Sequence, residues 1–189
     1  LTITIKDLLA RNALNFDLLS AVAISEGPGS YTGLRIGVSS AKALCYTLGI
    51  PLIAVSTLQA MALEMKLANS SAKYFAPMID ARRMEVYTAL FDSRLNEVGS
   101  VDAKVLDNDS FAETLLQSLV LFGGDGSSKF MPLVEGNSNA LFTNGLSPSA
   151  WAVGLLAHEK LIKSEFEDVA YFEPFYLKEY KATKSKPLL

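Results

Sequence analysis

The stretch "SEGPGSYTGLRIG", from Ser25 to Gly37, sets the organisation of the chain. It follows the apolar run "LLSAVAI", which predicts a buried strand, and "GPGS" then interrupts that strand with turn residues. A long segment of small and apolar residues comes next. It predicts a helix from Tyr31 or Thr32 to Leu48, because Gly49 and then Pro51 are the residues that usually end a helix. The stretch therefore predicts a strand, a glycine loop and a helix in succession.

The glycine loop allows two interpretations. A Walker phosphate loop needs Lys and Ser or Thr directly after its last glycine, whereas Gly33 is followed by Leu34 and Arg35. A dinucleotide-binding loop has glycines at its first, third and sixth positions, whereas Gly27, Gly29 and Gly33 occupy the first, third and seventh. The free N–H groups of a helix start can still bind an anion. The other interpretation is that the glycines let two pieces of backbone approach closely.

The helix after the loop has more apolar surface than one sheet can cover. At about 100° per residue, one face holds Gly33, Leu34, Gly37, Val38, Ala41, Leu44, Cys45 and Leu48. A second and milder face holds Ile36, Ser40, Ala43 and Thr47. A helix on a single sheet needs an apolar arc of little over about 100°. The second cover is either a helix of another chain, fitting against the small residues spaced four apart, or another part of this protein.

Composition limits the classes of function. The chain has 189 residues, half of them hydrophobic, and a net charge of -3, which argues against a freestanding nucleic-acid binder. One cysteine excludes an intrachain disulfide framework and predicts a reducing compartment, the cytoplasm. No apolar run approaches the roughly 18 residues of a membrane span. Because the chain opens with Leu1, within a pattern typical of a helix, we expect an N-terminal segment to be missing.

Strands and helices alternate along the rest of the chain, which predicts the α/β class. We expect a helix over residues 1–14, a strand "PLIAVS", and a helix from Ser56 or Thr57 to Leu67. The segment "YFAPMIDARRMEVYTALF" predicts a β-hairpin that turns at "DARR". The polar stretch "VDAKVLDNDS" is interpreted as the approach to a second unit, with the boundary near residue 100, so that residues 1–100 and 101–189 form two domains.

The second unit also alternates helices and strands, although the sequence has no internal repeat at a fixed period. A helix is expected from Ser110 to Leu119, followed by the strand "LVLFGG", a loop rich in Gly, Ser and Asn, and the strand "NALFT". The last helix is expected to have Ser147 as its cap and Pro148 at its first position, and to end near Lys163.

Few residues could carry catalysis. The only histidine, His158, shares a helical face with Trp151, Leu155, Leu161 and Ile162, which predicts a packed core histidine rather than a ligand. Cys45 lies mid-helix among apolar residues, which is typical of a buried thiol. The charged cluster Asp80, Arg82, Arg83 and Glu85 is either a solvated hairpin tip or part of a cleft between the domains.

Four segments carry a family resemblance: "GPGSYTGLRIGVSSAKAL", "GIPLIAVSTLQAMA", "DARRMEVYTALF" and "PFYLKEY". In this order they resemble the bacterial TsaB family, also called YeaZ, over essentially the whole chain. The resemblance implies the fold of the actin-like and sugar-kinase-like ATPases, with two ribonuclease H-like α/β domains facing a cleft. It implies a subunit of the machinery that attaches threonylcarbamoyl to the adenosine beside the anticodon of certain tRNAs. Family members begin with a β-hairpin that this sequence lacks.

The resemblance also implies a scaffold or activator without catalytic residues, cofactor or metal, outside the membrane. Its expected partners are the catalytic paralogue TsaD and the ATPase TsaE, with a homodimer when the paralogue is absent and tRNA contacted only through the complex. The expected partner-binding residues are Leu1, Ile5, Leu8, Gly33, Ile36, Gly37, Ser40, Ala41 and Leu44. The loop motif comprises Gly27, Pro28, Gly29, Ser30, Thr32 and Arg35, and the cleft candidates are Asp80, Arg82 and Glu85.

Three hypotheses remain beside the scaffold. One is an ATP-binding enzyme that uses the cleft between the domains, and another is a peptidase, which would have to use His158 or Cys45. The third concerns the basic C-terminal tail, in which Lys178, Lys181, Lys184 and Lys186 could lie near tRNA phosphates in the assembled complex.

Overall fold

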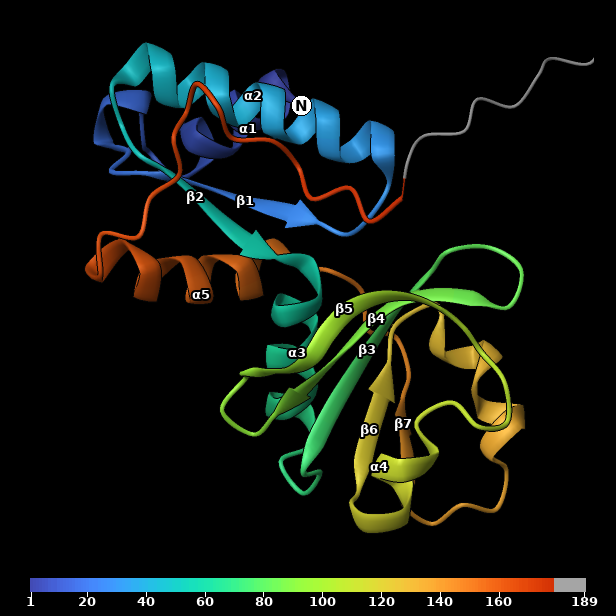
Figure 1. Cartoon of the computed structure of the whole chain (residues 1–189). Helices are drawn as coiled ribbons and strands as arrows, with labels where there is room; N and C mark the ends of the chain where they lie inside the picture. Colours follow the sequence, from blue (N-terminus) through green and yellow to red (C-terminus); the bar gives the residue numbers. More distant parts are fainter. Residues whose placement is uncertain (179–189) are drawn as a thin grey trace, which may run out of the picture.

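Two separate sheets organise the chain, and Figure 1 shows them one above the other. The computed structural model describes residues 1–178. The first sheet pairs two parallel strands, β1 (Val22–Gly27) and β2 (Leu52–Ser56). The second sheet has five strands in the order β5 (Glu97–Val105), β4 (Glu85–Asp92), β3 (Tyr74–Asp80), β6 (Val120–Gly123) and β7 (Ala140–Thr143).

Helices cover both faces of the first sheet. On one side lie α1 (Thr2–Arg11) and α2 (Tyr31–Leu48), and on the other side lies α5 (Ala150–Ile162) (Figure 1). Within β2, Leu52 packs against α2, whereas Ile53 and Val55 pack against α5. All three side chains are buried, so this strand is apolar without alternation, as a parallel strand covered on both faces should be.

The second sheet is also covered on both faces. On one face α3 (Thr57–Ala68) packs Leu58, Met61 and Met65 against the sheet. On the other face Phe122 and Phe130 pack with residues from α4 (Ala112–Gln117) and from the short 3-10 turn Met131–Val134. Another 3-10 turn, Ser127–Lys129, directly precedes Phe130. A further 3-10 turn, Phe16–Leu18, lies between α1 and β1. Helix α3 begins directly after β2 and thereby joins the two sheets.

Several predictions about elements are confirmed. The alternation of strands and helices is α/β, and the hairpin turns at residues 81–84. Helix α2 has Ser30 as its N-cap, whose hydroxyl accepts a hydrogen bond from the Gly33 N–H at 3.3 Å. The helix ends at Gly49, whose φ of 66° is the left-handed conformation that glycine adopts readily.

The segment expected to separate two domains is instead part of a strand. Residues 97–105 form β5, which pairs antiparallel with β4, so a boundary at residue 100 would cut the five-stranded sheet. As the edge strand, β5 leaves most of its side chains exposed, and the alternation of Val101, Ala103 and Val105 with charged residues is the only apolar pattern that marks it in the sequence. The division into 1–100 and 101–189 is therefore wrong as drawn: the two sheets separate between β2 and β3, and α5 returns to the first sheet.

Two helix ends also differ from their predictions. The cap of α5 is Ser149, not Ser147, and Pro148 precedes the helix instead of opening it. The Ser149 hydroxyl accepts a hydrogen bond from the Ala152 N–H and donates one to Glu64 of α3 at 2.5 Å. The residue that caps α5 therefore also joins this helix to α3. Helix α4 covers Ala112–Gln117, a shorter span than residues 110–119.

After α5 the chain returns across the first sheet. The Glu167 N–H donates to the Leu52 carbonyl at 2.9 Å, and the Phe175 N–H donates to the Glu26 carbonyl at 2.8 Å. Figure 1 shows this segment crossing alongside α2 and β1 on its way back to the end of β1. Within residues 1–178 no helix combines the length and the apolarity that crossing a bilayer requires.

Candidate functional site

Helix α1 leaves apolar side chains uncovered. None of its residues is buried within residues 1–178, and Ile3 and Leu8 are 77% and 60% exposed. Leu1, directly before the helix, is 59% exposed. A helix that packs only within its own chain normally buries its apolar stripe. The apolar surface of α1 is thus larger than the fold of this chain uses.

A groove between α1 and α2 extends this surface. It encloses about 520 Å³ and is lined by Thr2, Ile5, Phe16, Ser39, Ser40, Ala43, Leu44, Thr47 and Leu48. Ser40 and Ala43 belong to the second, less apolar face of α2, and their small side chains leave space for the groove. Ile36 lies on the same face of α2 by helical periodicity and is 54% exposed. We call these two helices' exposed apolar residues and the groove between them the α1–α2 surface.

The nine expected partner-binding residues divide into three groups, of which the third, Gly37 and Ala41, faces the interior. Ile5, Ser40 and Leu44 line the groove. The other exposed members are Leu1, Leu8, Gly33 and Ile36.

Ala41 and Gly37 lie on the inner side of α2, which corrects their expected place on the partner-binding face. Ala41 is 4% exposed and packs with Cys45 and Leu52 in this chain's own core. A Cβ added at Gly37 would lie 3.2 Å from Ile24 of β1, so this glycine faces the sheet. Gly37 and Ala41 thus follow the side of the helix that meets its own sheet, whereas Gly33, in the first turn, is exposed.

The glycine loop brings two pieces of backbone together, and both belong to this chain. Gly27 has a φ of 122°, and a Cβ there would lie 2.6 Å from the Phe175 carbonyl oxygen. The close approach joins the end of β1 to the returning C-terminal segment. Pro28, Gly29 and Ser30 then lead into α2, with Thr32 and Arg35 exposed in its first turns.

A cleft lies where this loop meets the hairpin turn of the second sheet. It encloses about 690 Å³. Its lining comprises residues 28–32 and Leu34 of the loop and α2, residues 79–82 of the hairpin turn, Tyr87, Asp125, and residues 175–178. Asp80 and Arg82 line the cleft, as expected. Glu85 does not line it, but its carboxylate forms an ion pair with Lys178, which does.

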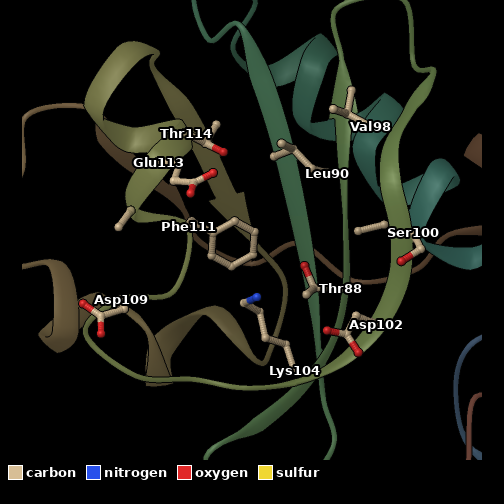
Figure 2. A pocket seen from close by; sticks show the side chains of 12 residues that line it. Thr88, Leu90, Val98, Ser100, Asp102, Lys104, Asp109, Phe111, Glu113 and Thr114 are labelled. Atoms are coloured by element: carbon tan, nitrogen blue, oxygen red, sulfur yellow. The ribbon is translucent and has the colours of Figure 1, made fainter.

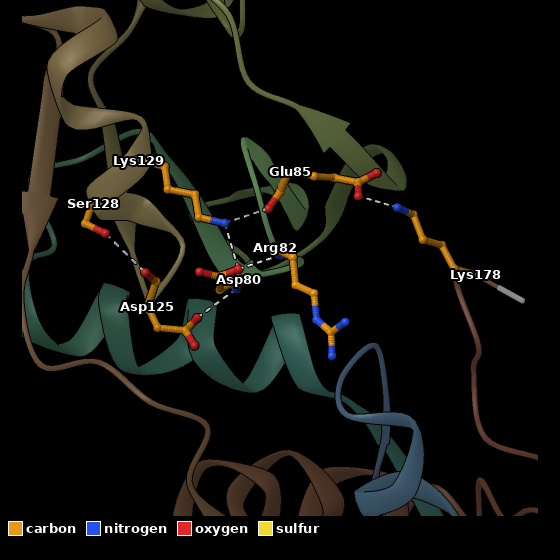
Figure 3. Close-up of polar contacts among 7 residues, drawn as sticks. All are labelled: Asp80, Arg82, Glu85, Asp125, Ser128, Lys129 and Lys178. Atoms are coloured by element: carbon orange, nitrogen blue, oxygen red, sulfur yellow. Dashed lines mark hydrogen bonds and ion pairs between the residues drawn. The ribbon is translucent and has the colours of Figure 1, made fainter. Parts of the chain in front are cut away.

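Asp80 is the centre of the polar contacts in the cleft wall (Figure 3). Its carboxylate accepts from Lys129 Nζ at 2.7 Å and from the Arg82 N–H at 2.6 Å, and its own N–H donates to Asp125 at 2.9 Å. The hydrogen bonds from Lys129 and the Arg82 backbone hold the pKa of Asp80 below its ordinary value. Lys129 also donates to the Glu85 carbonyl, so its ammonium is held in the wall.

Arg82 differs from its neighbours in this cluster. Its φ of 73° is in the left-handed region, and its side chain points away from Asp80, toward the loop that follows β1 (Figure 3). Among the described residues its guanidinium has no hydrogen bond or ion pair. This cation therefore faces the cleft without a partner within residues 1–178.

Sequence reasoning missed Asp125 and Lys129, which complete the cleft wall from the second sheet's own glycine loop. Their segment, "GGDGSSK", follows strand β6 as "EGPGS" follows β1. That repetition of a strand followed by a glycine loop was the available signal. Tyr176, a residue of the segment "PFYLKEY", also lines the cleft. The centre of its ring lies 4.8 Å from the centre of the Tyr31 ring.

The structure separates the two residues that a peptidase would need. Cys45 is 2% exposed on the inner face of α2, and burial raises the pKa of its thiol. His158 is exposed on α5, so the prediction of a packed core histidine is wrong. The buried residues of α5 are Ala152, Val153 and Ala157, because its small side chains fit against the sheet and its large ones face outward. Within residues 1–178 no three His, Cys, Asp or Glu side chains gather as a metal site would need.

Comparisons with known proteins agree on one family. The family model described as "TsaD: tRNA N6-adenosine threonylcarbamoyltransferase" matches residues 1–184. The chain is 33% identical to the "tRNA threonylcarbamoyladenosine biosynthesis protein TsaB" of Bacillus subtilis, over 85% of this chain and 70% of that protein. It is 29% identical to the TsaB protein of Escherichia coli, over 97% and 81%.

A solved structure gives the same result for the fold. YeaZ from Pseudomonas aeruginosa aligns with a TM-score of 0.71 and 26% sequence identity, covering 92% of this chain and 80% of that one. The expected actin-like α/β fold is confirmed by this likeness together with the family match. The chain belongs to the TsaB (YeaZ) family, and it also matches the TsaD family model over most of its length.

Proposed function

We propose that this chain is a scaffold and activator subunit in the formation of threonylcarbamoyladenosine in tRNA. The names of the TsaB relatives support the pathway. The observation that carries the role is the α1–α2 surface, which exposes large apolar side chains around a groove of about 520 Å³. Exposed apolar surface of this kind marks a protein interface.

The partner in this proposal is the TsaD-like catalytic subunit. Because this chain matches the TsaD family model over residues 1–184, the partner's own α1 and α2 should have the same arrangement. Two such helix pairs can pack face to face, with the small residues Ser40 and Ala43 allowing close approach. The same self-complementary surface would form a homodimer when the catalytic subunit is absent. The TsaE-like ATPase joins this complex, and tRNA is contacted through the assembly.

The chemistry then belongs to the partner. In this chain Cys45 is buried and His158 lies on the outer side of α5, so neither is placed to act on a substrate with the other. The contribution of this chain is to hold the catalytic subunit in its working arrangement. The setting for this activity is the cytoplasm, where tRNA is modified.

Ser40→Glu tests the surface directly. Ser40 lines the groove without being buried, so a charged side chain there should block the partner and leave the fold intact. In a reconstituted system with the catalytic subunit, the ATPase and tRNA, we expect modification to fall by at least about tenfold, because a buried unpaired charge costs several kcal/mol. Circular dichroism and thermal unfolding check the fold.

Leu116→Glu is the matched control. Leu116 is an apolar residue of α4 that is 81% exposed on the second sheet's side of the molecule, so the same change of charge occurs away from the α1–α2 surface. It should leave modification unchanged. Full activity of folded Ser40→Glu, or equal losses in both variants, would contradict the proposed surface.

A second candidate function rests on the cleft. Its volume of about 690 Å³ and its position between two glycine loops suit a nucleotide, and Arg82 offers a cation to a phosphate. A rise in unfolding temperature on addition of ATP and Mg²⁺, abolished in Arg82→Ala, would support nucleotide binding by this chain alone. The absence of any shift would leave the cleft as a structural junction.

A further inference from the structure

A third hollow lies on the second sheet, apart from both the groove and the cleft. It encloses about 440 Å³ between strands β4 and β5 and the start of α4, and Figure 2 shows the side chains that line it. Thr88 and Leu90 come from β4, and Asp102 and Lys104 come from β5. Phe111 is the N-cap of α4, and Glu113 lies in its first turn. Its size is within the range of sites for small molecules.

Thr88 gives this hollow a polar group that the fold does not use. The residue is 2% exposed, and its hydroxyl has no hydrogen-bond partner within residues 1–178. A buried hydroxyl without a partner destabilises a protein, whereas valine has the same shape and lacks this cost. The hydroxyl lies on the sheet face that carries Phe111 and Lys104, which is the face that lines the hollow (Figure 2).

Asp102 stands directly across from Thr88. The two residues are paired in the register of β4 and β5, so their side chains point to the same face and lie within about 5 Å of each other. Like Thr88, Asp102 has no side-chain hydrogen bond or ion pair to another described residue. A hydrogen-bond donor placed above this pair would reach a hydroxyl and a carboxylate at once.

The charges around the hollow favour a cation. Asp109 and Glu113 lie at its rim and, within the described part of the chain, neither carboxylate has a partner. The one cation, Lys104, has its ammonium 5.3 Å from the centre of the Phe111 ring. Three carboxylates against one ammonium leave the hollow net negative, while Leu90 and Val98 give it an apolar wall.

We propose that this hollow binds a small aliphatic amine. Its ammonium donates hydrogen bonds to the Thr88 hydroxyl and the Asp102 carboxylate, and its hydrocarbon chain packs against Leu90 and Phe111. A second ammonium at the other end of a short chain reaches the carboxylates at the rim. This inference does not depend on the proposed role in tRNA modification, because the hollow shares no lining residue with the α1–α2 groove or the cleft.

Titration calorimetry with 1,4-diaminobutane tests the site. The wild-type chain should bind it saturably at millimolar concentration, whereas 1,4-butanediol, which has the same length and no charge, should give no heat. Thr88→Val and Asp102→Asn should each weaken binding by about tenfold or more, as expected for a lost hydrogen bond to a charged group. Thr88→Val should unfold at a temperature no lower than that of the wild type.

Glu97→Gln is the control, since Glu97 is an exposed carboxylate on β5 whose side chain lies on the opposite face of the strand from Asp102. It should bind the diamine as the wild type does. The proposal is overturned if the wild type shows no saturable binding, or if all three variants bind equally. Asp102 is exposed, so Asp102→Asn gives a decisive result even if Thr88→Val does not fold.

Discussion

Asp80 connects the hairpin turn to the loop that follows β6 through its carboxylate and its backbone N–H. Lys129 donates to the carboxylate from a position 49 residues away, the Arg82 N–H donates from the hairpin turn, and the Asp80 N–H donates to Asp125. These bonds fix the turn that lines the cleft. Their strength is limited because the Asp80 side chain is 41% exposed, and water screens the charges.

Asp80→Asn is expected to lower stability in a pH-dependent way. The pKa of Asp80 is lowered in the folded protein from an ordinary value of 3.8, so its contribution is present above that pH and is lost as the pH falls through the folded-state value. Urea unfolding should therefore show a lower midpoint for the variant at about pH 7, and the difference should shrink as the pH falls below 3.8. A deficit at acid pH as large as that at neutral pH would contradict the ion pair as its cause.

Gly27→Ala should destabilise the junction between β1 and the C-terminal segment. A φ of 122° is unfavourable for alanine, and the added Cβ would lie 2.6 Å from the Phe175 carbonyl. We expect a loss of about 2 kcal/mol or more in the free energy of unfolding. Gly49→Ala is the control, because Gly49 also has a positive φ, of 66°, but no atom within 4 Å of the added Cβ. Equal losses in the two variants would show that the contact with Phe175 does not matter.

For single residues, the sequence predicts where a side chain lies better than it predicts which residue that side chain contacts. The clustering of charge predicts Asp80 and Arg82 at a strand end, and both line the cleft. Lys129 could not be matched to Asp80, because nothing in a single sequence links residues 49 apart across a sheet. His158 was misplaced for a different reason: the periodicity gave its helical face correctly, but not which face met the sheet.

Among the elements, the returning C-terminal segment depends on α2. Lys42 Nζ donates to the Ala170 carbonyl at 3.1 Å and to the Phe172 carbonyl at 2.9 Å. Phe172 also packs at the edge of the core cluster formed by Ala41, Cys45 and Leu52. One lysine thus satisfies two carbonyls of a segment that has no strand or helix of its own after α5.

Lys42→Met should loosen this segment while keeping the aliphatic stem of the side chain. Two carbonyls lose a charged donor, and we expect hydrogen exchange to become faster in residues 167–175 and the free energy of unfolding to fall by roughly 1 to 3 kcal/mol. Lys66→Met on α3 is the control, since Lys66 has no side-chain hydrogen bond or ion pair among the described residues. Unchanged exchange in residues 167–175 would contradict the role of Lys42.

The sequence predicts best those helices and strands whose beginning and end are both marked by characteristic residues. Helix α2 has a cap and a terminal glycine, and it was placed within one residue at each end. Strand β5 has only a short alternation, at Val101, Ala103 and Val105, because its edge position leaves most of its side chains exposed and most of the rest of its sequence is polar or small. The cap of α5 was assigned to Ser147 because proline follows it, whereas the contact between Ser149 and Glu64 could be seen only in the folded chain.

At the scale of the whole molecule, the two sheets have different tasks in the proposed account. The first sheet presents the α1–α2 surface on its helical side, and the second sheet supplies most of the polar side of the cleft. The sequence predicted two α/β units and the family, because strand and helix signals are local. It could not place their division, since α5 returns to the first sheet from the far end of the chain.

The size of the protein in solution tests the central claim most directly. Light scattering should give the mass of a dimer for the chain alone, and the mass of a mixed complex when an equal amount of the TsaD-like catalytic subunit is added, because the two compete for the α1–α2 surface. Ser40→Glu should be monomeric and should not join the complex. A wild-type chain that stays monomeric alone and remains separate from the catalytic subunit would contradict the account.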